Sequence, residues 1–318
     1  MARVRLATAV LLLSLTLTAC GTTTQEDISH PDHSDATELN VVSEWPEADI
    51  VPVAAGDSAI VKFRSAGRDR SFILSVPASY DPAVSWPVVF AFHGKDETAA
   101  KTRSYTQLDR SESLVVYGEG VARAWAPAPY AETSIQDDIT YVRDILAMVS
   151  ANYTVGENRV AATGFSNGGG FAVLLGCRAP ELVSAVAPVG AAFYDDVFAN
   201  CSHQPIPFLG VHGTDDAVKN YGGGSSFDQS YKSNFEVYRI MRERNGCSGE
   251  GEFTQDTPSA VHVTYESCDA PLVHIRNEGG THRWPGTTYD PTPGMPIGYT
   301  TDLILGFFDV LADRPQQK

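Results

Sequence analysis

The feature that most constrains the fold is a serine between an apolar run and a run of small residues. The sequence is RVAATGF over residues 159–165, continues with Ser166, and then has NGGG over residues 167–170. The apolar run predicts a buried strand, and the residues from 168 to 175 predict a helix. Gly164 and Gly168 complete the pattern G-x-S-x-G, in which a serine on a sharp strand-to-helix turn exposes its hydroxyl. We therefore expect Ser166 to be a nucleophile.

Apolar runs and helical patterns alternate along the chain on both sides of this turn. Strands are predicted at residues 59–63, 71–76, 87–92, 114–117, 159–165, 183–189, 207–211, 260–265 and 272–275. Helices are predicted at residues 135–149, 168–175, 230–244 and 301–311. This alternation is typical of an α/β fold with a mostly parallel central sheet covered by helices on both faces. We expect one catalytic domain over residues 56–318.

The N-terminal residues have the features of an export signal. Arg3 and Arg5 form a short basic region, and the apolar stretch over residues 7–17 is too short for an ordinary membrane-spanning helix. The stretch ends in the sequence LTACG, which contains Cys20 and resembles the lipobox of bacterial lipoproteins. We expect a lipoprotein signal peptide over residues 1–19 and a lipidated Cys20. The alternative is a plain secretory signal, and both imply export to an oxidising compartment.

Residues 20–55 are predicted to be a flexible tether, because they are polar and acidic and lack apolar periodicity. The whole chain of 318 residues has a formal net charge of −16. This charge argues against a nucleic-acid partner, since phosphate contacts need clustered Lys and Arg. The sequence also has no HExxH, P-loop or dinucleotide fingerprint, so we expect no cofactor and no metal.

A nucleophilic serine on such a turn needs an acid and a base, in the chain order Ser, then Asp or Glu, then His. Asp215 and Asp216 are both candidates for the acid, because they follow the predicted strand 207–211. His282 is the best candidate for the base, because it lies in a loop after the last predicted strand, where such sheets bind ligands. His262 and His274 lie inside predicted strands, where a packed structural histidine is the simpler interpretation.

Two backbone amides are expected to stabilise the oxyanion that would form during acyl transfer. One belongs to Asn167, directly after the serine, and the other to Lys95, in the loop after the predicted strand 87–92. His93 precedes the nucleophile in the chain, so we interpret it as structural. Aromatic residues near these positions are candidate walls of a substrate site, with ordinary core packing as the alternative. They are Trp125, Tyr130, Phe165 and Trp284.

Several of these motifs together resemble the secreted polyhydroxybutyrate-depolymerase and feruloyl-esterase group of the α/β-hydrolases. The motifs are DDI at residues 137–139, TGFSNGG at 163–169, HGTDD at 212–216, RNGC at 244–247 and GGTHRWPG at 279–286. The resemblance implies an α/β-hydrolase fold with Ser166 as nucleophile, Asp216 as acid and His282 as base. The chain departs from the group at Lys95, where cysteine or glycine is usual, and at Thr281, where the group has glycine.

Four cysteines remain after Cys20, and they allow three disulfide connectivities. The resemblance implies the nearest-neighbour pairing, Cys177 with Cys201 and Cys247 with Cys268. A zinc site is the alternative, but the wide spacings and the lack of CxxC disfavour it.

The expected function is that of an exported serine esterase with an acyl-enzyme mechanism. The resemblance implies feruloyl or acetyl esters of plant polysaccharides, or short polyhydroxyalkanoate oligomers, as substrates. The alternatives are a non-catalytic binding lipoprotein on a hydrolase scaffold and a serine peptidase. The expected partners are a small or oligomeric ester and a membrane reached only through a lipid anchor. We expect a monomer at the cell surface, or freely secreted if Cys20 is not lipidated.

Overall fold

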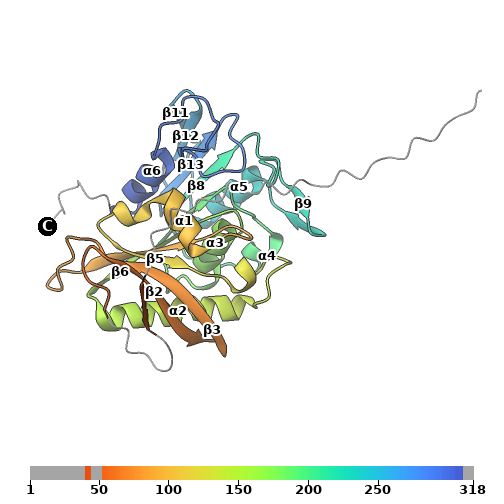
Figure 1. Ribbon diagram of the computed structural model, residues 1–318. Helices are drawn as coiled ribbons and strands as arrows, with labels where there is room; N and C mark the ends of the chain where they lie inside the picture. The colour runs from red at the N-terminus through yellow and green to blue at the C-terminus, as the bar shows by residue number, and fades with distance from the viewer. Residues whose placement is uncertain (1–39, 44–51, 311–318) are drawn as a thin grey trace, which may run out of the picture. The chain divides into compact units, whose positions relative to one another are not determined.

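The computed structural model describes residues 40–43 and 52–310. The predicted signal peptide, Cys20 and most of the predicted tether lie outside these residues. Eleven strands form one sheet in the order β1-β2-β3-β5-β4-β6-β7-β8-β13-β12-β11 (Figure 1). The α/β fold with a mostly parallel central sheet is therefore confirmed.

The centre of the sheet is parallel, from β5 through β4, β6, β7 and β8 to β13. These strands are β4 (Trp86–Phe92), β5 (Leu114–Gly118), β6 (Val155–Phe165), β7 (Ala185–Val189), β8 (Phe208–Gly213) and β13 (Leu272–Asn277). Antiparallel strands flank them on both sides. The flanking strands are β2 (Ser58–Ser65), β3 (Arg68–Ser75), β11 (Gly251–Gln255) and β12 (Ala260–Tyr265). The carboxyl ends of the parallel strands thus share one edge, where the loops carry the candidate site residues.

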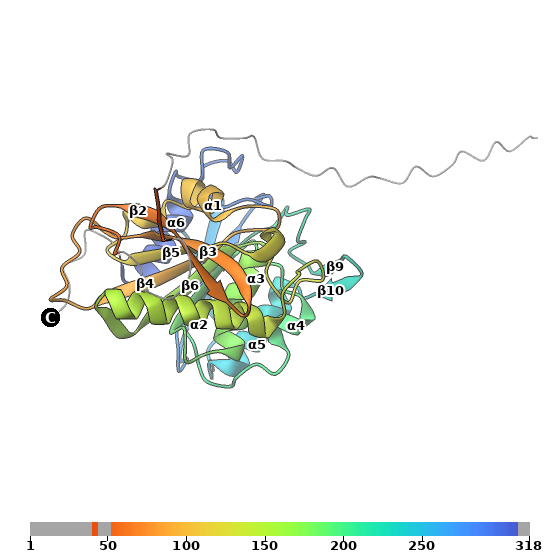
Figure 2. The ribbon, with the colours of Figure 1, turned by 60° about the horizontal axis from the view of Figure 1, so that its bottom comes forward.

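Helices cover both faces of this sheet, as Figure 2 shows. The helices are α1 (Ala99–Thr106), α2 (Ile135–Asn152), α3 (Asn167–Arg178), α4 (Asp195–Phe198), α5 (Asn234–Arg244) and α6 (Tyr299–Phe307). Side chains along β4 alternate between the two faces. Phe90 and Phe92 belong to the buried cluster that includes side chains of α2, α3 and α5, whereas Val89 and Ala91 belong to the cluster that includes side chains of α1 and α6. Every residue of β4 is buried, which explains its continuous apolar sequence.

Part of the predicted tether forms a strand. This strand, β1 (Asn40–Ser43), pairs in parallel with β2. Val41 and Val42 are β-branched and favour a strand, and the pairing covers the outer edge of β2. The packed domain also begins earlier than predicted. Val53 is buried, and its N–H donates to the Tyr153 hydroxyl over 2.6 Å.

The helix predicted at residues 230–244 begins later, at Asn234. Ser233 caps it and forms a capping box with Glu236. The preceding residues instead form a hairpin of β9 (Gly224–Ser226) and β10 (Gln229–Tyr231). Neither this hairpin nor α1 and β11 was predicted, because none of these short segments has a strong apolar period.

Candidate active site

Ser166 lies on a strained turn between β6 and α3. Its backbone has φ 52° and ψ −115°, a conformation that is rare for a residue with a side chain. The turn is fixed by the neighbouring strand and its loop. The Ser166 N–H donates to the carbonyl of Val189, and its carbonyl accepts from the N–H of Ala192, both over 2.9 Å.

The two glycines of the turn are required by close backbone contacts. A Cβ on Gly168 would lie 2.2 Å from the carbonyl oxygen of Phe92, and one on Gly164 would lie 2.5 Å from the carbonyl of Gly168. The helix α3 therefore packs directly on the end of β4, and only glycine permits this approach. Ser166 is held at the carboxyl edge of the sheet as a result.

The structure brings Ser166, His282 and Asp216 into one chain of hydrogen bonds. His282 Nε2 lies 2.9 Å from Ser166 Oγ, and His282 Nδ1 lies 2.7 Å from Asp216 Oδ2. A carboxylate accepts only, so Nδ1 carries the proton and Nε2 is free to accept from the serine hydroxyl. Asp215 is exposed, whereas Asp216 is buried against His282. The geometry thus distinguishes the two aspartates that the residue pattern alone left open.

The surroundings of Asp216 keep it ionised. Burial would raise the pKa of its carboxyl, but hydrogen bonds from His212 and His282 outweigh burial and hold the pKa well below its usual range. Its other oxygen, Oδ1, accepts from the backbone N–H groups of Val218 and Lys219 at 2.8 and 2.7 Å. A permanently charged acid beside His282 would stabilise a protonated imidazole.

The two expected oxyanion donors lie in segments that are held by side chains. Asn167 is the first residue of α3, where amide groups lack a partner within the helix. Its own side chain accepts from the N–H of Trp125 and donates to the carbonyl of Trp125, at 2.8 and 2.9 Å. Lys95 lies in the loop after β4, and its ammonium pairs with the carboxylate of Asp96 and lies 5.5 Å from the ring centre of Tyr130.

The hydrogen bonds of His93 give it a structural role in this loop. Its Nε2 accepts from the N–H of Gly120 at 2.9 Å, and its Nδ1 donates to the carbonyl of Gly94 at 2.7 Å. Burial lowers the pKa of His93 to about 4. Both nitrogens of the neutral ring are therefore used to hold the loop, and neither faces Ser166.

Three of the four candidate aromatic walls are buried, and only Tyr130 is partly exposed. Trp125 is 0% exposed and stacks on Phe171, so its position in the core beneath α3 fits the alternative of ordinary core packing. Trp284 is also buried, with its indole N–H bonded to Thr301, so it too belongs to the core. Burial of these large rings depends on helices distant in sequence, which a local motif does not show.

Phe165 and Tyr130 remain beside the site. The Phe165 ring is buried with its centre 4.7 Å from that of His282, so it supports the imidazole from behind. Tyr130 is half-buried and contacts Phe227, at the tip of the β9–β10 hairpin, with ring centres 4.8 Å apart. Phe227 is 55% exposed and was not predicted from the sequence. Lys95, Tyr130 and Phe227 together form a patch of two aromatic rings beside a lysine that is paired with Asp96; we call it the rim patch.

Three further polar residues near the site were missed. The carboxylate of Glu97 accepts from the N–H of Gly94 and from the Tyr105 hydroxyl, both at 3.0 Å, and burial raises its pKa. His212 contacts Asp216 directly. The ammonium of Lys219 is buried beneath the hairpin, where burial lowers its pKa to about 8. Only His212 had a sequence signal, since it opens the HGTDD motif.

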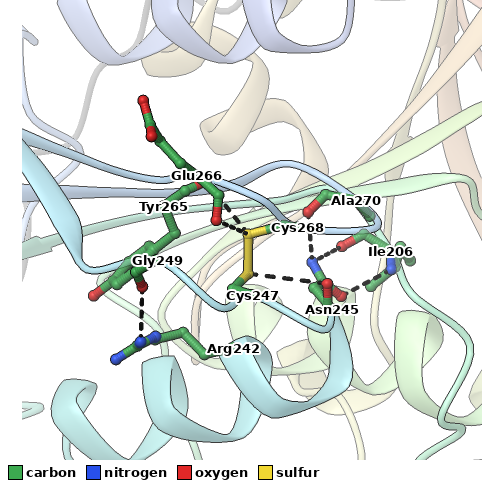
Figure 3. The surroundings of a disulfide bond; sticks show 9 residues. All are labelled: Ile206, Arg242, Asn245, Cys247, Gly249, Tyr265, Glu266, Cys268 and Ala270. Atoms are coloured by element: carbon green, nitrogen blue, oxygen red, sulfur yellow. Dashed lines mark hydrogen bonds between the residues drawn. A yellow bond between two sulfur atoms is a disulfide. The ribbon is translucent and has the colours of Figure 1, made fainter.

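The disulfides are Cys177–Cys201 and Cys247–Cys268, as the resemblance implied. Figure 3 shows the second, which joins the segment after α5 to the connection between β12 and β13. The side chain of Asn245 lies beside it and donates to the carbonyls of Ile206 and Ala270. Disulfides that close loops of this length each stabilise a fold by about 3 kcal/mol.

Residues 40–43 and 52–310 contain neither a candidate membrane-spanning helix nor a candidate metal site. None of the helices there has both the length and the apolar character needed to cross a bilayer. The same residues contain no group of three or more His, Cys, Asp or Glu that could hold a metal ion.

The chain is similar to known esterases in sequence. The Esterase family model, described as "Putative esterase", matches residues 64–199. The chain is 26% identical over 219 residues to "Probable feruloyl esterase C" of Aspergillus clavatus, covering 66% of this chain and 75% of that protein. It is also 25% identical over 289 residues to "Putative esterase NocK" of Nocardia uniformis, covering 82% and 83% of the two chains.

Solved structures of esterases share the fold. An acetyl xylan esterase from Aspergillus awamori superposes with a TM-score of 0.54 at 16% identity, covering 75% of this chain and 93% of that one. Esterase 2 of Thermogutta terrifontis, phosphorylated by paraoxon, has a TM-score of 0.52 at 15% identity, covering 78% and 93%. At these identities the structures are evidence for the fold alone. The structures therefore show that the chain has an α/β-hydrolase fold. The sequence relatives show that it is similar to the feruloyl esterase group and that its activity is that of a carboxylic ester hydrolase.

Proposed function

We propose that this protein is an exported serine esterase that uses Ser166, His282 and Asp216 in an acyl-enzyme mechanism. The observation that carries the proposal is the hydrogen-bond chain of 2.9 Å and 2.7 Å from Ser166 through His282 to Asp216. A serine hydroxyl is a weak nucleophile until a neighbouring base removes its proton, and this chain provides the base and the group that orients it.

The mechanism follows from these roles. His282 Nε2 takes the proton of Ser166 as Oγ attacks the ester carbonyl, and Asp216 stabilises the imidazolium. The amides of Asn167 and Lys95 donate to the oxyanion of the tetrahedral intermediate. His282 then gives its proton to the departing alcohol, which leaves the acyl group on Ser166. Water, deprotonated by His282, attacks this ester and releases the acid.

The substrates we propose are feruloyl or acetyl esters on plant polysaccharides, or short polyhydroxyalkanoate oligomers. The names of the relatives support the first group, since several are feruloyl esterases. The rim patch also supports an extended substrate, because Phe227 and Tyr130 offer aromatic surface beside the loop of Lys95.

The test is the Ser166→Ala variant, assayed on a p-nitrophenyl ester, methyl ferulate, acetylated xylo-oligosaccharides, hydroxybutyrate oligomers and peptides. We expect turnover of the preferred ester to fall by about 10⁴-fold with the fold intact by circular dichroism. Ser104→Ala, an exposed serine on α1, is the matched control and should keep wild-type turnover. If Ser166→Ala keeps more than a tenth of wild-type turnover, Ser166 is not the nucleophile. Preferred cleavage of peptides would instead support a peptidase, and a wild type inactive on every substrate would support a binding protein.

We also propose that the enzyme is held at the cell surface through lipid on Cys20. The support is the sequence LTACG at the end of the apolar stretch. Stable membrane attachment needs more than one acyl chain, which bacterial lipoprotein cysteines usually carry. In a bacterial host, the wild type should stay with the membrane in high salt, and Cys20→Ser should release the protein or block its processing. Mass spectrometry of the mature N-terminus decides the matter, because an unmodified peptide beginning at or after Gly21 would show free secretion.

A further inference from the structure

His212 lies behind the proposed acid, and the mechanism above does not use it. It is the fifth residue of β8, is buried, and opens the HGTDD motif whose last residue is Asp216. A buried imidazole in contact with a buried carboxylate needs a physical reason, because both groups lose hydration there.

The hydrogen-bond partners of His212 fix where its proton lies. Nε2 is 2.7 Å from the carbonyl oxygen of Lys219 and 3.2 Å from Oδ2 of Asp216. Both of these are acceptors, so Nε2 must carry the proton and donate. Nδ1 is buried and has no hydrogen-bond partner among the described residues. A proton on Nδ1 would therefore be an unpaired buried donor, so the structure favours the neutral ring with a single N–H at Nε2.

This N–H completes the set of donors around Asp216. Oδ1 is occupied by the amides of Val218 and Lys219, which fix one side of the carboxylate. Oδ2 faces two rings, His282 at 2.7 Å and His212 at 3.2 Å. The same N–H of His212 reaches the carbonyl of Lys219, so it joins both ends of the loop that carries the acid.

We propose that His212 is a positioning residue for the ester hydrolysis proposed above: its Nε2–H holds Oδ2 of Asp216 toward His282 and closes the loop 213–219 onto β8. The inference rests on that proposed function. The role needs an N–H donor at the position of Nε2 and does not need a charge on the ring.

Other side chains, several of them charged or titratable, surround His212 and Asp216, and a test of His212 must leave them unchanged. The rings of Tyr221 and Phe193 pack on His212, with centres 5.9 and 6.4 Å away. Lys219 interacts electrostatically with Asp216, and His274 with His212. Arg276 is paired with His212 in the register of β13 and β8, and its side chain bonds to Glu278. None of these side chains is altered in the His212 variants below.

The test compares three substitutions at residue 212. Gln can place its amide N–H near the position of Nε2, Asn places one nearer Nδ1, and Leu has no donor. We expect His212→Leu and His212→Asn to lower kcat by about 10- to 100-fold with KM nearly unchanged, and His212→Gln to recover most of this loss. Loss of the donor should also move the acid limb of the kcat profile to higher pH, because the coupled Asp216–His282 pair then holds its proton more tightly.

His274→Leu is the matched control. His274 is the second buried histidine of this region, lies on the adjacent strand β13, and bonds to the Tyr221 hydroxyl at 3.0 Å. It should keep kcat within about twofold of the wild type, because it does not touch Asp216. Near-UV circular dichroism identifies any variant that does not fold, and the Asn and Gln pair still decides the question if the Leu variant fails.

The proposal is overturned if Asn and Gln lose kcat equally, or if all His212 variants keep the wild-type kcat and acid limb. A loss in His274→Leu as large as that in His212→Leu would also overturn it, since general loosening of the region would then explain both. These outcomes are separate from failure of the proposed function, which would appear as an active Ser166→Ala enzyme.

Discussion

The turn that carries Ser166 and the loops that carry Asp216 and His282 are built in different ways. Backbone contacts hold the turn: Ser166 bonds to the main chain of Val189 and Ala192, and Gly168 packs on the carbonyl of Phe92. Side-chain hydrogen bonds hold the loops, with Asp216 at their centre. This difference indicates which substitutions each region tolerates. A change in the turn should damage the fold, whereas a change in the loops should damage the chemistry and leave the fold largely intact.

The largest expected effect tests the loops. Asp216→Asn should lower kcat by about 10⁴-fold, because an amide cannot stabilise the imidazolium and favours the wrong tautomer of His282. Its thermal unfolding midpoint should stay within a few degrees of the wild type at pH 7. Steady-state kinetics and calorimetry measure both quantities.

Asp215→Asn is the control for this prediction, because Asp215 is the exposed neighbour of the same chemical type. The kcat of this variant should fall by less than about fivefold. The opposite order of the two losses would move the acid to Asp215 and contradict the hydrogen bond between Asp216 and His282.

The second prediction tests the turn. An alanine normally stabilises a helix relative to glycine by about 1 kcal/mol. In Gly168→Ala, however, the new Cβ would lie 2.2 Å and 2.5 Å from the carbonyl oxygens of Phe92 and His93. Backbone atoms on both sides cannot move without disturbing β4, so we expect a loss of about 3 kcal/mol or more in the free energy of unfolding. Denaturant unfolding measures the change.

Gly176→Ala is the matched control in the same helix. Its Cβ would meet only the side-chain methyl groups of Ile206 and Val186, both at 3.1 Å, and these can shift. We expect the free energy of unfolding to change by less than about 1.5 kcal/mol in either direction. Equal losses in the two variants would mean that the backbone contact of Gly168 is not special, and the contrast between the two regions would fail.

The same contrast explains what could be predicted from the sequence. The turn of Ser166 is local, because its glycines, its strand and its helix are consecutive, so its position and shape followed from the residue pattern. Chain order, and the rule that loops at the carboxyl ends of strands form such sites, predicted His282 and the pair Asp215 and Asp216. The choice of Asp216 came from the resemblance. The strands β2 to β8, β12 and β13 were predicted within a few residues, and β4 was the clearest because it is continuously apolar.

Residues whose role depends on tertiary packing were not predictable in this way. Trp125 and Tyr130 belong to one loop and have similar surroundings in sequence, yet one is in the core and the other is half-buried beside Phe227. Glu97 and Lys219 are ordinary surface residue types, yet the fold half-buries Glu97 and buries Lys219 near the site. Their burial is decided by α1 and by the β9–β10 hairpin, neither of which has a recognisable period.

The smallest expected effect compares the buried histidines of the two regions by pH. His93 lies beside the turn with both nitrogens bonded, and His274 lies beneath the loops with its Nε2 at the Tyr221 hydroxyl. Burial lowers the pKa of His93 to about 4 and that of His274 to about 3. In the unfolded chain a histidine titrates near 6.5, so below that pH the unfolded state binds protons that the native state does not. Stability from each neutral ring is complete above about pH 6.5 and is lost as the pH falls toward the folded pKa.

The His274→Leu variant isolates one of these two contributions. Between pH 7 and pH 5 the wild type should lose about 1.5 to 2 kcal/mol more free energy of unfolding than the variant, since one histidine costs about 1.4 kcal/mol for each pH unit below 6.5. Groups with raised pKa, such as the carboxyl of Glu97, act in both proteins and cancel in the difference. Urea unfolding at the two pH values provides the measurement. A pH dependence that is the same in variant and wild type would mean that His274 accepts a proton in the folded state, and that the region beneath the loops is more open to water than the turn.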